Sequence, residues 1–236
     1  MVRDYLKGDS KALGRPMEAL WIGHSGRPVL MFPTSMGRFN ELEDFGLIGA
    51  LGGKFEAGEI QAICVETIDQ ESWYNKGLHP GARARRHEQY DNYLRHELLP
   101  YIHERSGRRD LAVYGASFGA YHAANFACRY PEAVAKAITF SGIYDIHRYL
   151  DGYWDDCCYF HCPTAYVPNM DEATARRFHS TQFIVATGEH DSLVNENRSF
   201  AAMLGGKGIP VHSEIWAGEF GHDWPWWKHH LARFLP

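Results

Sequence analysis

The sequence has no long hydrophobic run and no strong excess of charge of either sign. No apolar stretch approaches the roughly 18–20 residues that a helix needs to span a bilayer. Residues 1–14 hold no apolar segment like that of a secretion signal. The 24 Lys and Arg against 29 Asp and Glu give a formal net charge of −5, without the concentrated basic face typical of nucleic-acid binders. We therefore expect a soluble, cytoplasmic protein without a nucleic-acid or membrane partner; its oligomeric state is not predicted.

Cysteine is sparse and is not spaced like a zinc site. The chain has five cysteines, and without an export signal we expect them to be reduced. Three of them, Cys157, Cys158 and Cys162, lie beside His161. Structural zinc sites use spaced pairs such as C-x-x-C, with a second pair to complete the tetrahedron, whereas here two cysteines are adjacent and no second cluster follows. This pattern predicts a partly buried loop with free thiols and no metal ion.

Internal repeats, low-complexity tracts and flexible linkers are also absent, so we expect residues 1–236 to form one domain. Short β-type runs alternate with helical stretches, which predicts an α/β fold with a mostly parallel central sheet flanked by helices. The predicted strands are residues 19–24, 28–32, 60–67, 111–114, 137–140, 183–187 and 211–216, with 2–6 as an outer hairpin strand. The predicted helices are residues 41–51, 87–104, 118–129, 171–179, 192–204 and 224–234.

Charged side chains outside the recognisable motifs are predicted to be exposed to solvent. Arg83, Arg85 and Arg86 precede the long helix predicted at 87–104, and His229 and His230 lie on the last predicted helix. Pro100 falls inside that long helix, where a missing N–H is expected to kink it.

The residues that indicate chemistry are 111–120, LAVYGASFGA, which hold the pattern G-x-S-x-G centred on Ser117. The pattern follows a predicted strand and precedes a predicted helix, the context of a nucleophilic serine raised on a sharp turn. Gly115 and Gly119 remove side chains that would collide across such a turn. The helix that starts behind Ser117 also points its positive end toward developing negative charge.

A serine hydroxyl needs a base, and the base needs an orienting acid. In this type of fold the acid and then the histidine follow the serine along the chain, each on a loop after a late strand. The strand at 183–187 leads to Asp191, and the strand at 211–216 leads to His222. The order Ser117, Asp191, His222 therefore predicts a catalytic triad.

Other residues are candidates for the acid and for the base. Glu189 is the second candidate for the acid, and Asp145 is a more distant one. His190 would break the chain order as the base, and His212 lies inside a predicted strand. His222 follows a glycine that lets its loop turn inward, so we favour it.

An oxyanion needs two donors, one of which is the backbone N–H of the residue after the nucleophile, Phe118. The other is expected from the loop after the strand at 28–32, at the N–H of Ser35 or Met36. Aromatic residues near predicted loop tips are candidates for the wall of a substrate pocket, although many aromatic residues simply pack loops onto a sheet. The candidates are Trp73, Tyr74, Tyr153, Trp154, Tyr159 and Trp224, of which we favour Trp73, Tyr74, Trp154 and Trp224.

Four segments resemble one known family. They are residues 28–44, PVLMFPTSMGRFNELED; 71–94, ESWYNKGLHPGARARRHEQYDNYL; 111–132, LAVYGASFGAYHAANFACRYPE; and 218–231, GEFGHDWPWWKHHL. The sequence is similar to the bacterial putative esterase group of α/β-hydrolases, related to esterase D (S-formylglutathione hydrolase), enterochelin esterases and mycolyltransferases. The resemblance implies a cofactor-free serine hydrolase without a large cap domain, with Ser117, Asp191 and His222 as triad and 34–36 as oxyanion loop.

The predicted function is therefore a carboxylesterase that acts on a small-molecule ester through an acyl-enzyme. An acyltransferase, a thioesterase or a hydrolase of polyester fragments would use the same triad. A non-catalytic binding module is a further alternative, because the fold alone does not determine function.

Overall fold

The computed structural model describes residues 2–235, so the two end residues of the predicted domain, 1 and 236, lie outside the described part. Eight strands form one sheet in the order β1-β2-β4-β3-β5-β6-β7-β8. The strands are β1 Arg3–Ser10, β2 Arg15–Ile22, β3 Arg27–Phe32, β4 Ile60–Val65, β5 Leu111–Ala116, β6 Val134–Phe140, β7 Gln182–Gly188 and β8 Val211–Trp216. Strands β3 to β8 pair in parallel, whereas β1 and β2 form an antiparallel hairpin and β2 runs antiparallel to β4. The predicted mostly parallel α/β fold is confirmed.

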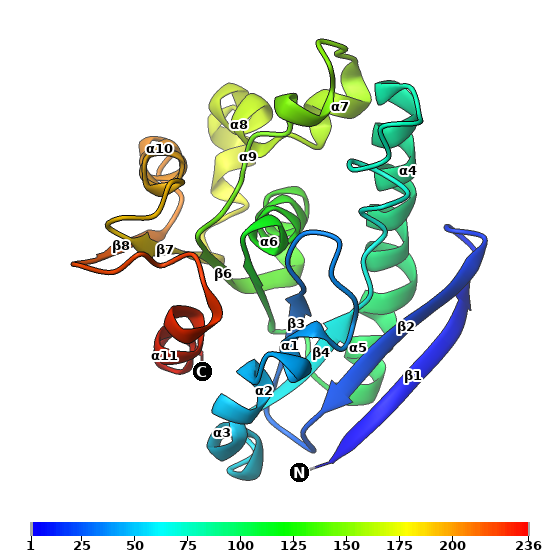
Figure 1. The fold of residues 1–236 in the computed structure, drawn as a ribbon, viewed down its shortest axis with the longest axis vertical. Helices are drawn as coiled ribbons and strands as arrows, with labels where there is room; N and C mark the ends of the chain where they lie inside the picture. Colours follow the sequence, from blue (N-terminus) through cyan, green and yellow to red (C-terminus); the bar gives the residue numbers. More distant parts are fainter. Residues whose placement is uncertain (1, 236) are drawn as a thin grey trace.

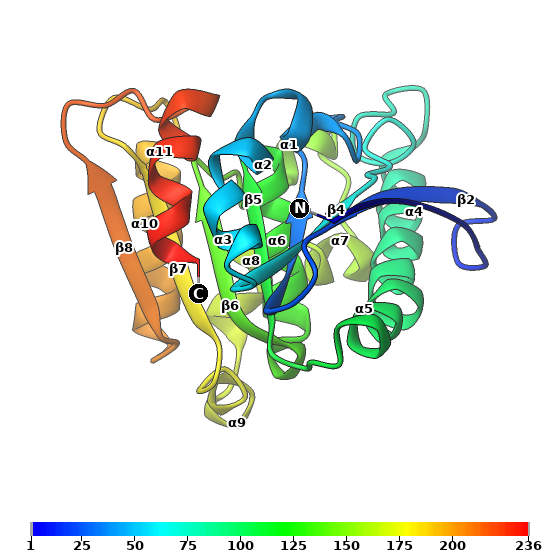
Figure 2. The ribbon, with the colours of Figure 1, turned by 90° about the horizontal axis from the view of Figure 1, so that it is seen from below.

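Helices cover both faces of this sheet (Figures 1 and 2). One face carries α1 Glu41–Asp44, α2 Leu47–Ala50, α3 Gly52–Glu56 and α11 Trp224–Phe234. The other carries α4 Pro80–Tyr93, α5 Leu99–Ser106, α6 Phe118–Arg129 and α10 Val194–Gly206. Successive side chains of a strand point to opposite faces, so Val29 and Met31 join one core cluster while Leu30 and Phe32 join the other. A central strand buried on both sides explains the continuous apolar run in the sequence.

The remaining helices are short. They are α7 Asp156–Phe160, α8 Pro163–Tyr166 and α9 Glu172–Arg176, with 3₁₀ turns at Pro131–Ala133, His147–Tyr149 and Val167–Asn169. Cys157 and Cys158 lie on α7, so the prediction of a loop at this point is wrong. The helix forms because the Asp155 carboxylate caps it, accepting the Cys158 N–H at 2.9 Å. The predicted helix at 41–51 is also divided, because Gly46 adopts a left-handed conformation with φ 78°.

The long helix beside the hairpin starts earlier than predicted. Its first residue is Pro80, and one π-helical turn at Leu94–Leu98 separates α4 from α5, just before Pro100. Arg83 therefore lies inside the helix and is 2% exposed, donating to the carbonyl oxygens of Tyr149 and Asn75 at 2.7 Å each. The prediction of a solvent-exposed Arg83 is wrong, because backbone carbonyls of neighbouring loops surround its guanidinium group.

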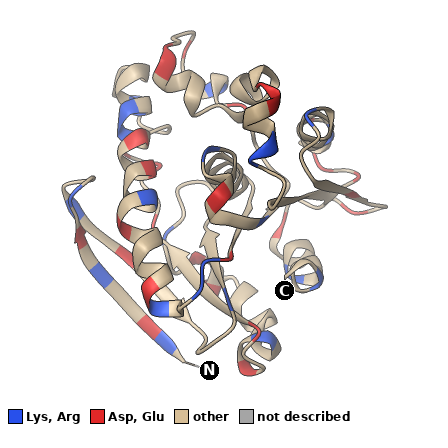
Figure 3. Cartoon of the chain, turned by 180° about the vertical axis from the view of Figure 1, so that it is seen from behind, with Lys and Arg blue, Asp and Glu red and all other residues tan. Residues whose placement is uncertain are grey.

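Charges of both signs are intermixed along the long helix and the outer hairpin (Figure 3). Several form ion pairs between these elements, such as Arg105 on α5 with Asp4 on β1, and others tie the hairpin to α1, such as Arg3 with Glu43 at 2.7 Å. None of the described helices is long and apolar enough to cross a membrane.

The parallel strands all end at one edge of the sheet, and this edge positions the candidate site. The loops after β3, β5, β7 and β8 begin there and hold, in turn, residues 33–37, Ser117, Asp191 and His222. The carboxyl ends of parallel strands are where ligands bind in open α/β sheets.

Candidate active site

Ser117 lies on a sharp turn between β5 and α6. Its backbone angles, φ 56° and ψ −121°, are strained for a residue with a side chain. A Cβ on Gly115 would lie 2.0 Å from the carbonyl oxygen of Gly119, and a Cβ on Gly119 would lie 2.4 Å from that of Pro33. The turn therefore requires glycine at both positions. This turn places the Ser117 hydroxyl at the sheet edge, directly before the positive end of the twelve-residue helix α6.

His222 reaches Ser117 from the loop after β8. Its Nε2 lies 3.1 Å from Ser117 Oγ, and its Nδ1 lies 3.2 and 3.3 Å from the two carboxylate oxygens of Asp191. The loop approaches the end of β7 closely, since a Cβ on Gly221 would be 2.1 Å from the backbone nitrogen of Gly188. The structure therefore brings together the three side chains that the sequence order selects.

Asp191 is enclosed and well supplied with donors. Its side chain is fully buried, and besides His222 it accepts the Thr187 hydroxyl at 2.6 Å and the Leu193 N–H at 2.8 Å. Burial raises the pKa of this carboxyl, but the hydrogen bonds from His222, Leu193 and Thr187 outweigh it and leave the pKa below its usual value. The carboxylate is thus ionised at neutral pH and can orient the imidazole.

The rival residues have other partners. Glu189 accepts the Gly218 N–H at 2.9 Å, and Asp145 pairs with His147 at 2.6 Å. His190 packs against Phe220, and His212 lies on β8 beside Glu214. Among the described residues, the contacts with Ser117 therefore favour Asp191 and His222 over these alternatives.

Between residues 33 and 37, the loop after β3 presents one backbone N–H that has no acceptor within the described chain. The Thr34 N–H donates to Glu41 at 2.6 Å, and the Met36 N–H donates to Asp69 at 2.9 Å. Within residues 2–235, the N–H groups of Ser35 and Phe118 donate to no protein acceptor. The prediction of Met36 as an oxyanion donor is contradicted, because Asp69 already occupies its N–H, and Ser35 stays as the candidate.

The chain matches a known protein family. Residues 23–236 match the family model described as Putative esterase. This chain belongs to the putative esterase family. It is a carboxylic ester hydrolase, as the resemblance in the sequence implied. A search of the curated proteins finds none with significant similarity to the sequence.

Solved structures share the fold of this esterase at low sequence identity. A ferulic acid esterase aligns with a TM-score of 0.79 and 18% identity, covering 100% of this chain and 96% of its own. The S-formylglutathione hydrolase FrmB from Staphylococcus aureus aligns with a TM-score of 0.75 and 16% identity, covering 98% and 96%. MPT51 from Mycobacterium tuberculosis aligns with a TM-score of 0.72 and 16% identity, covering 99% and 96%. In the described part of the esterase, residues 2–235, no large cap domain is evident, as predicted.

The aromatic residues predicted to contact substrate do not form one surface. Trp73 is 0% exposed and packs against His87 and Tyr121, so its prediction as a substrate contact is wrong. Tyr74 instead faces the oxyanion loop, with its hydroxyl 2.8 Å from Ser35 Oγ.

The two remaining tryptophans of that prediction lie on different elements of the esterase. Trp154 is 39% exposed and stacks on His147 with ring centroids 4.2 Å apart. Trp224, the first residue of α11, stacks on Phe45 at 4.6 Å. His230, predicted to be exposed, is instead buried and stacks on Trp216 at 4.0 Å, so that prediction is wrong.

Sequence reasoning missed a residue that holds the histidine loop. Ser141 follows β6 with φ 50°, donates to the Gly221 carbonyl at 2.6 Å and accepts the indole N–H of Trp227 at 3.1 Å. A signal for Ser141 was present, because it follows a parallel strand at the edge that carries the other loops.

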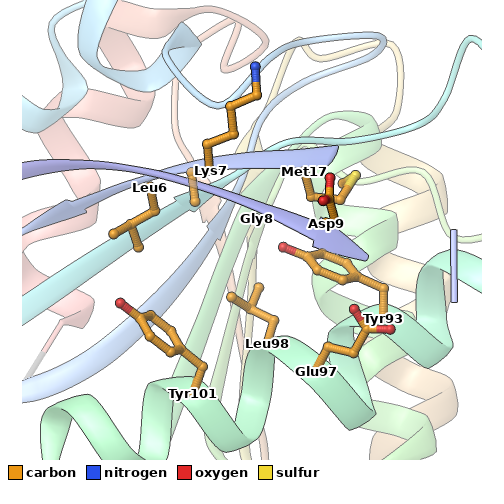
Figure 4. A pocket seen from close by; sticks show the side chains of 10 residues that line it. Leu6, Lys7, Gly8, Asp9, Met17, Tyr93, Glu97, Leu98 and Tyr101 are labelled. Atoms are coloured by element: carbon orange, nitrogen blue, oxygen red, sulfur yellow. The ribbon is translucent and has the colours of Figure 1, made fainter. Parts of the chain in front are cut away.

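A pocket of about 360 Å³ opens away from these residues, between the outer hairpin and the long helix (Figure 4). Its wall is formed by Leu6, Met17, Leu98, Tyr93 and Tyr101, among others. No residue of the candidate active site lines it, so this pocket does not present an ester to Ser117.

Among residues 2–235 of the esterase, two groups of side chains have donors for a metal ion. Glu88, Cys157 and His161 form one group, and Asp145, His147 and Cys162 form the other, each with ligand atoms within 4.8 Å of one another. Each supplies three donors, one fewer than structural zinc sites use. Neither contains Ser117, Asp191 or His222.

Proposed function

We propose that this esterase cleaves a small-molecule ester through an acyl-enzyme on Ser117, with His222 as general base and Asp191 as the orienting acid. The observation that carries the proposal is the continuous contact from Ser117 Oγ to His222 Nε2 at 3.1 Å and from His222 Nδ1 to the buried Asp191 carboxylate. A nucleophile and a base within hydrogen-bond reach, with the base oriented by a third group, is the arrangement that activates a serine.

In the first step, Ser117 Oγ attacks the ester carbonyl carbon and its proton passes to His222 Nε2. The carbonyl oxygen becomes an oxyanion, which accepts hydrogen bonds from the backbone N–H groups of Phe118 and Ser35. Collapse of this intermediate breaks the ester C–O bond, and His222 gives its proton to the departing alkoxide. Water then attacks the acyl-enzyme with His222 again as base, which releases the acid and restores the Ser117 hydroxyl.

Exposed apolar side chains on the loops beside Ser117 favour an ester with an apolar group. Met36 on the oxyanion loop is 45% exposed, and Phe220, two residues before His222, is 68% exposed. Covering exposed apolar surface at a site with an apolar ligand is favourable, because it removes that surface from water. A series of p-nitrophenyl esters of increasing acyl length, run beside matched thioesters, measures this preference.

The decisive experiment is labelling with a fluorophosphonate probe, which reacts with an activated serine. We expect the wild type to label stoichiometrically and Ser117→Ala not to label. Ser199→Ala, on the exposed face of α10, is the control and should label like the wild type. A folded wild type that does not label would overturn the proposal, and labelling that survives in Ser117→Ala would show that another residue is the nucleophile.

A further inference from the structure

A second carboxylate–histidine pair lies behind the candidate site. Asp69 follows β4 and His122 lies on α6, and their side chains are 0% and 1% exposed. His122 Nε2 and Asp69 Oδ1 are 2.8 Å apart. Taking a carboxylate out of water is costly unless strong partners replace the water, and no part of the proposed reaction uses this pair.

The second oxygen of Asp69 holds the oxyanion loop. Asp69 Oδ2 accepts the N–H of Met36 at 2.9 Å, so one carboxylate connects α6 to this loop. Met36 has φ 59°, a left-handed conformation that costs energy for a residue with a side chain. Because the hydrogen bond from Met36 is made in this conformation, Asp69 stabilises the turn that leaves the neighbouring Ser35 N–H free.

His122 holds the other end of the connection. It lies four residues after Phe118 on α6, one helical turn away, and its ring packs edge-on against Phe118 with centroids 5.2 Å apart. The same ring stacks on Phe32, the last residue of β3, at 5.6 Å. His122 therefore belongs to the helix that supplies one donor and packs against the strand that leads to the other.

We propose that Asp69 and His122 are positioning residues, which hold the N–H groups of Ser35 and Phe118 at the separation that an oxyanion requires. The inference rests on the proposed function, because it concerns the same oxyanion. Two donors on separate loops act together only if the distance between them is kept, and a misplacement of about 1 Å costs about 10²-fold in rate.

Asp69→Asn tests the proposal with little change of shape. The amide keeps one acceptor oxygen, so it can accept from His122 or from Met36 but not from both. We expect kcat for a p-nitrophenyl ester to fall about 10²-fold while KM changes little, because the lost interaction acts on the transition state.

The readout specific to positioning is the rate of an oxo ester compared with its thiono analogue, in which sulfur replaces the carbonyl oxygen. Sulfur is a weak hydrogen-bond acceptor, so the thiono ester gains little from the donors. The oxo-to-thiono ratio of kcat/KM should fall in Asp69→Asn, whereas a general loss of active protein lowers both rates equally and leaves the ratio unchanged.

A second variant and a matched control keep the test independent of folding. His122→Phe keeps a ring against Phe118 and loses the donor to Asp69, so it should lower the same ratio, and His122→Gln, which restores an N–H donor, should recover part of it. Asp91→Asn is the control, since Asp91 is equally buried at 3% exposure but pairs with Arg129 on the far end of α6. Its ratio should match that of the wild type.

The results separate the two hypotheses. A wild type that labels with fluorophosphonate, together with ratios in Asp69→Asn and His122→Phe equal to that of Asp91→Asn, overturns the positioning role alone. A folded wild type that neither labels nor turns over either ester overturns the proposed function and the inference with it.

Discussion

The two turns that present the free amides of Phe118 and Ser35 are held in different ways. The turn at Ser117 is shaped in part by its neighbours in sequence, since a Cβ at Gly115 would lie 2.0 Å from the Gly119 carbonyl oxygen. It also packs closely against the end of β3, where a Cβ at Gly119 would lie 2.4 Å from the Pro33 carbonyl oxygen. The turn at Ser35 has one local bond, from the Gly37 N–H to the Thr34 carbonyl. Its side-chain hydrogen bonds join it to Glu41, Asp69 and Tyr74, which lie 7 to 39 positions from the residues they contact. The first turn therefore has a strong local determinant at Gly115, and the second is held mainly by side chains distant in the sequence.

The largest effect is expected from Asp191→Asn. This substitution leaves both turns intact, so it shows the effect of impairing the general base while the oxyanion donors stay in place. An asparagine donates to the imidazole and favours the wrong tautomer, so kcat should fall about 10⁴-fold, as for the same change in a serine protease. Steady-state kinetics on a p-nitrophenyl ester measures this. An unchanged oxo-to-thiono ratio is expected, and a lowered ratio would show that Asp191 also supports the oxyanion donors.

The same variant carries a prediction on pH and stability. The folded protein holds the pKa of Asp191 below its unfolded value, which is about 3.9. The carboxylate therefore contributes stability that is present above pH about 4 and is lost as the pH falls through the folded pKa. Denaturant titrations from pH 7 downward, at about one-unit steps, should show the free energy of unfolding falling more steeply for the wild type than for Asp191→Asn. Parallel curves would contradict this.

The turn at Ser117 is broken by Gly119→Ala. The new Cβ would lie 2.4 Å from the Pro33 carbonyl oxygen and 2.8 Å from that of Phe32, and backbone atoms cannot move aside cheaply. Forcing α6 away from β3 should lower kcat about 10²-fold and destabilise the protein by about 1–3 kcal/mol.

Gly49→Ala is the matched control for that substitution. Nothing lies within 4 Å of a Cβ at Gly49, so its stability should stay within about 0.5 kcal/mol of the wild type. Equal stability and activity in both alanine variants would show that the turn at Ser117 tolerates a side chain and would remove the contrast between the two turns.

The turn at Ser35 is weakened by Glu41→Gln. The Glu41 carboxylate accepts both the N–H and the hydroxyl of Thr34. In Gln the amide oxygen accepts one bond and the NH₂ donates to the Thr34 hydroxyl, so both bonds become bonds between neutral groups. Replacing charge-assisted bonds by neutral ones, a loss of about 1.4 kcal/mol, predicts a tenfold lower kcat/KM. The oxo-to-thiono ratio should fall with it, and a normal ratio would show that Thr34 does not influence the Ser35 amide.

Glu41 also differs from Asp191 in its response to pH. Burial raises the pKa of Glu41 above its ordinary value, although the hydrogen bonds from Thr34 oppose the shift. A raised folded pKa gives stability that is present below the unfolded pKa, about 4.3, and lost as the pH rises through the folded value. The wild type should therefore lose stability relative to Glu41→Gln on titration upward through this window, and the opposite slope would contradict the assignment.

The smallest effect is expected from Tyr74→Phe. The Tyr74 hydroxyl contacts Ser35 Oγ at 2.8 Å and the Tyr149 hydroxyl at 3.0 Å, so it restrains the side chain of Ser35 rather than its amide. Losing one partly buried bond of about 0.5 kcal/mol predicts a two- to threefold lower kcat. A loss of kcat as large as that in Asp69→Asn would show that the Tyr74 hydroxyl is as important as Asp69 for holding the oxyanion loop.

Much of the fold was predictable because parallel strands have a local signature. Apolar runs located the parallel strands β3 to β7, and β8 was also predicted although this edge strand is largely exposed. The expected hairpin exists, although β1 continues to Ser10 beyond the predicted end at residue 6. The cysteine segment was not predictable as helix, because α7 has only five residues and is too short to show a helical pattern of apolar residues. The helix depends instead on the cap that Asp155 provides.

By itself, the sequence determined the turn at Ser117 and the order in which Ser117, Asp191 and His222 follow one another. Gly115 leaves the room that a sharp turn from strand to helix needs, and the order along a chain is not changed by folding. Only the tertiary structure decided that Ser35 rather than Met36 has a free amide and that Trp73 and Arg83 are buried. These outcomes depend on which distant groups occupy each donor and cover each side chain, and such groups become neighbours only when the sheet assembles.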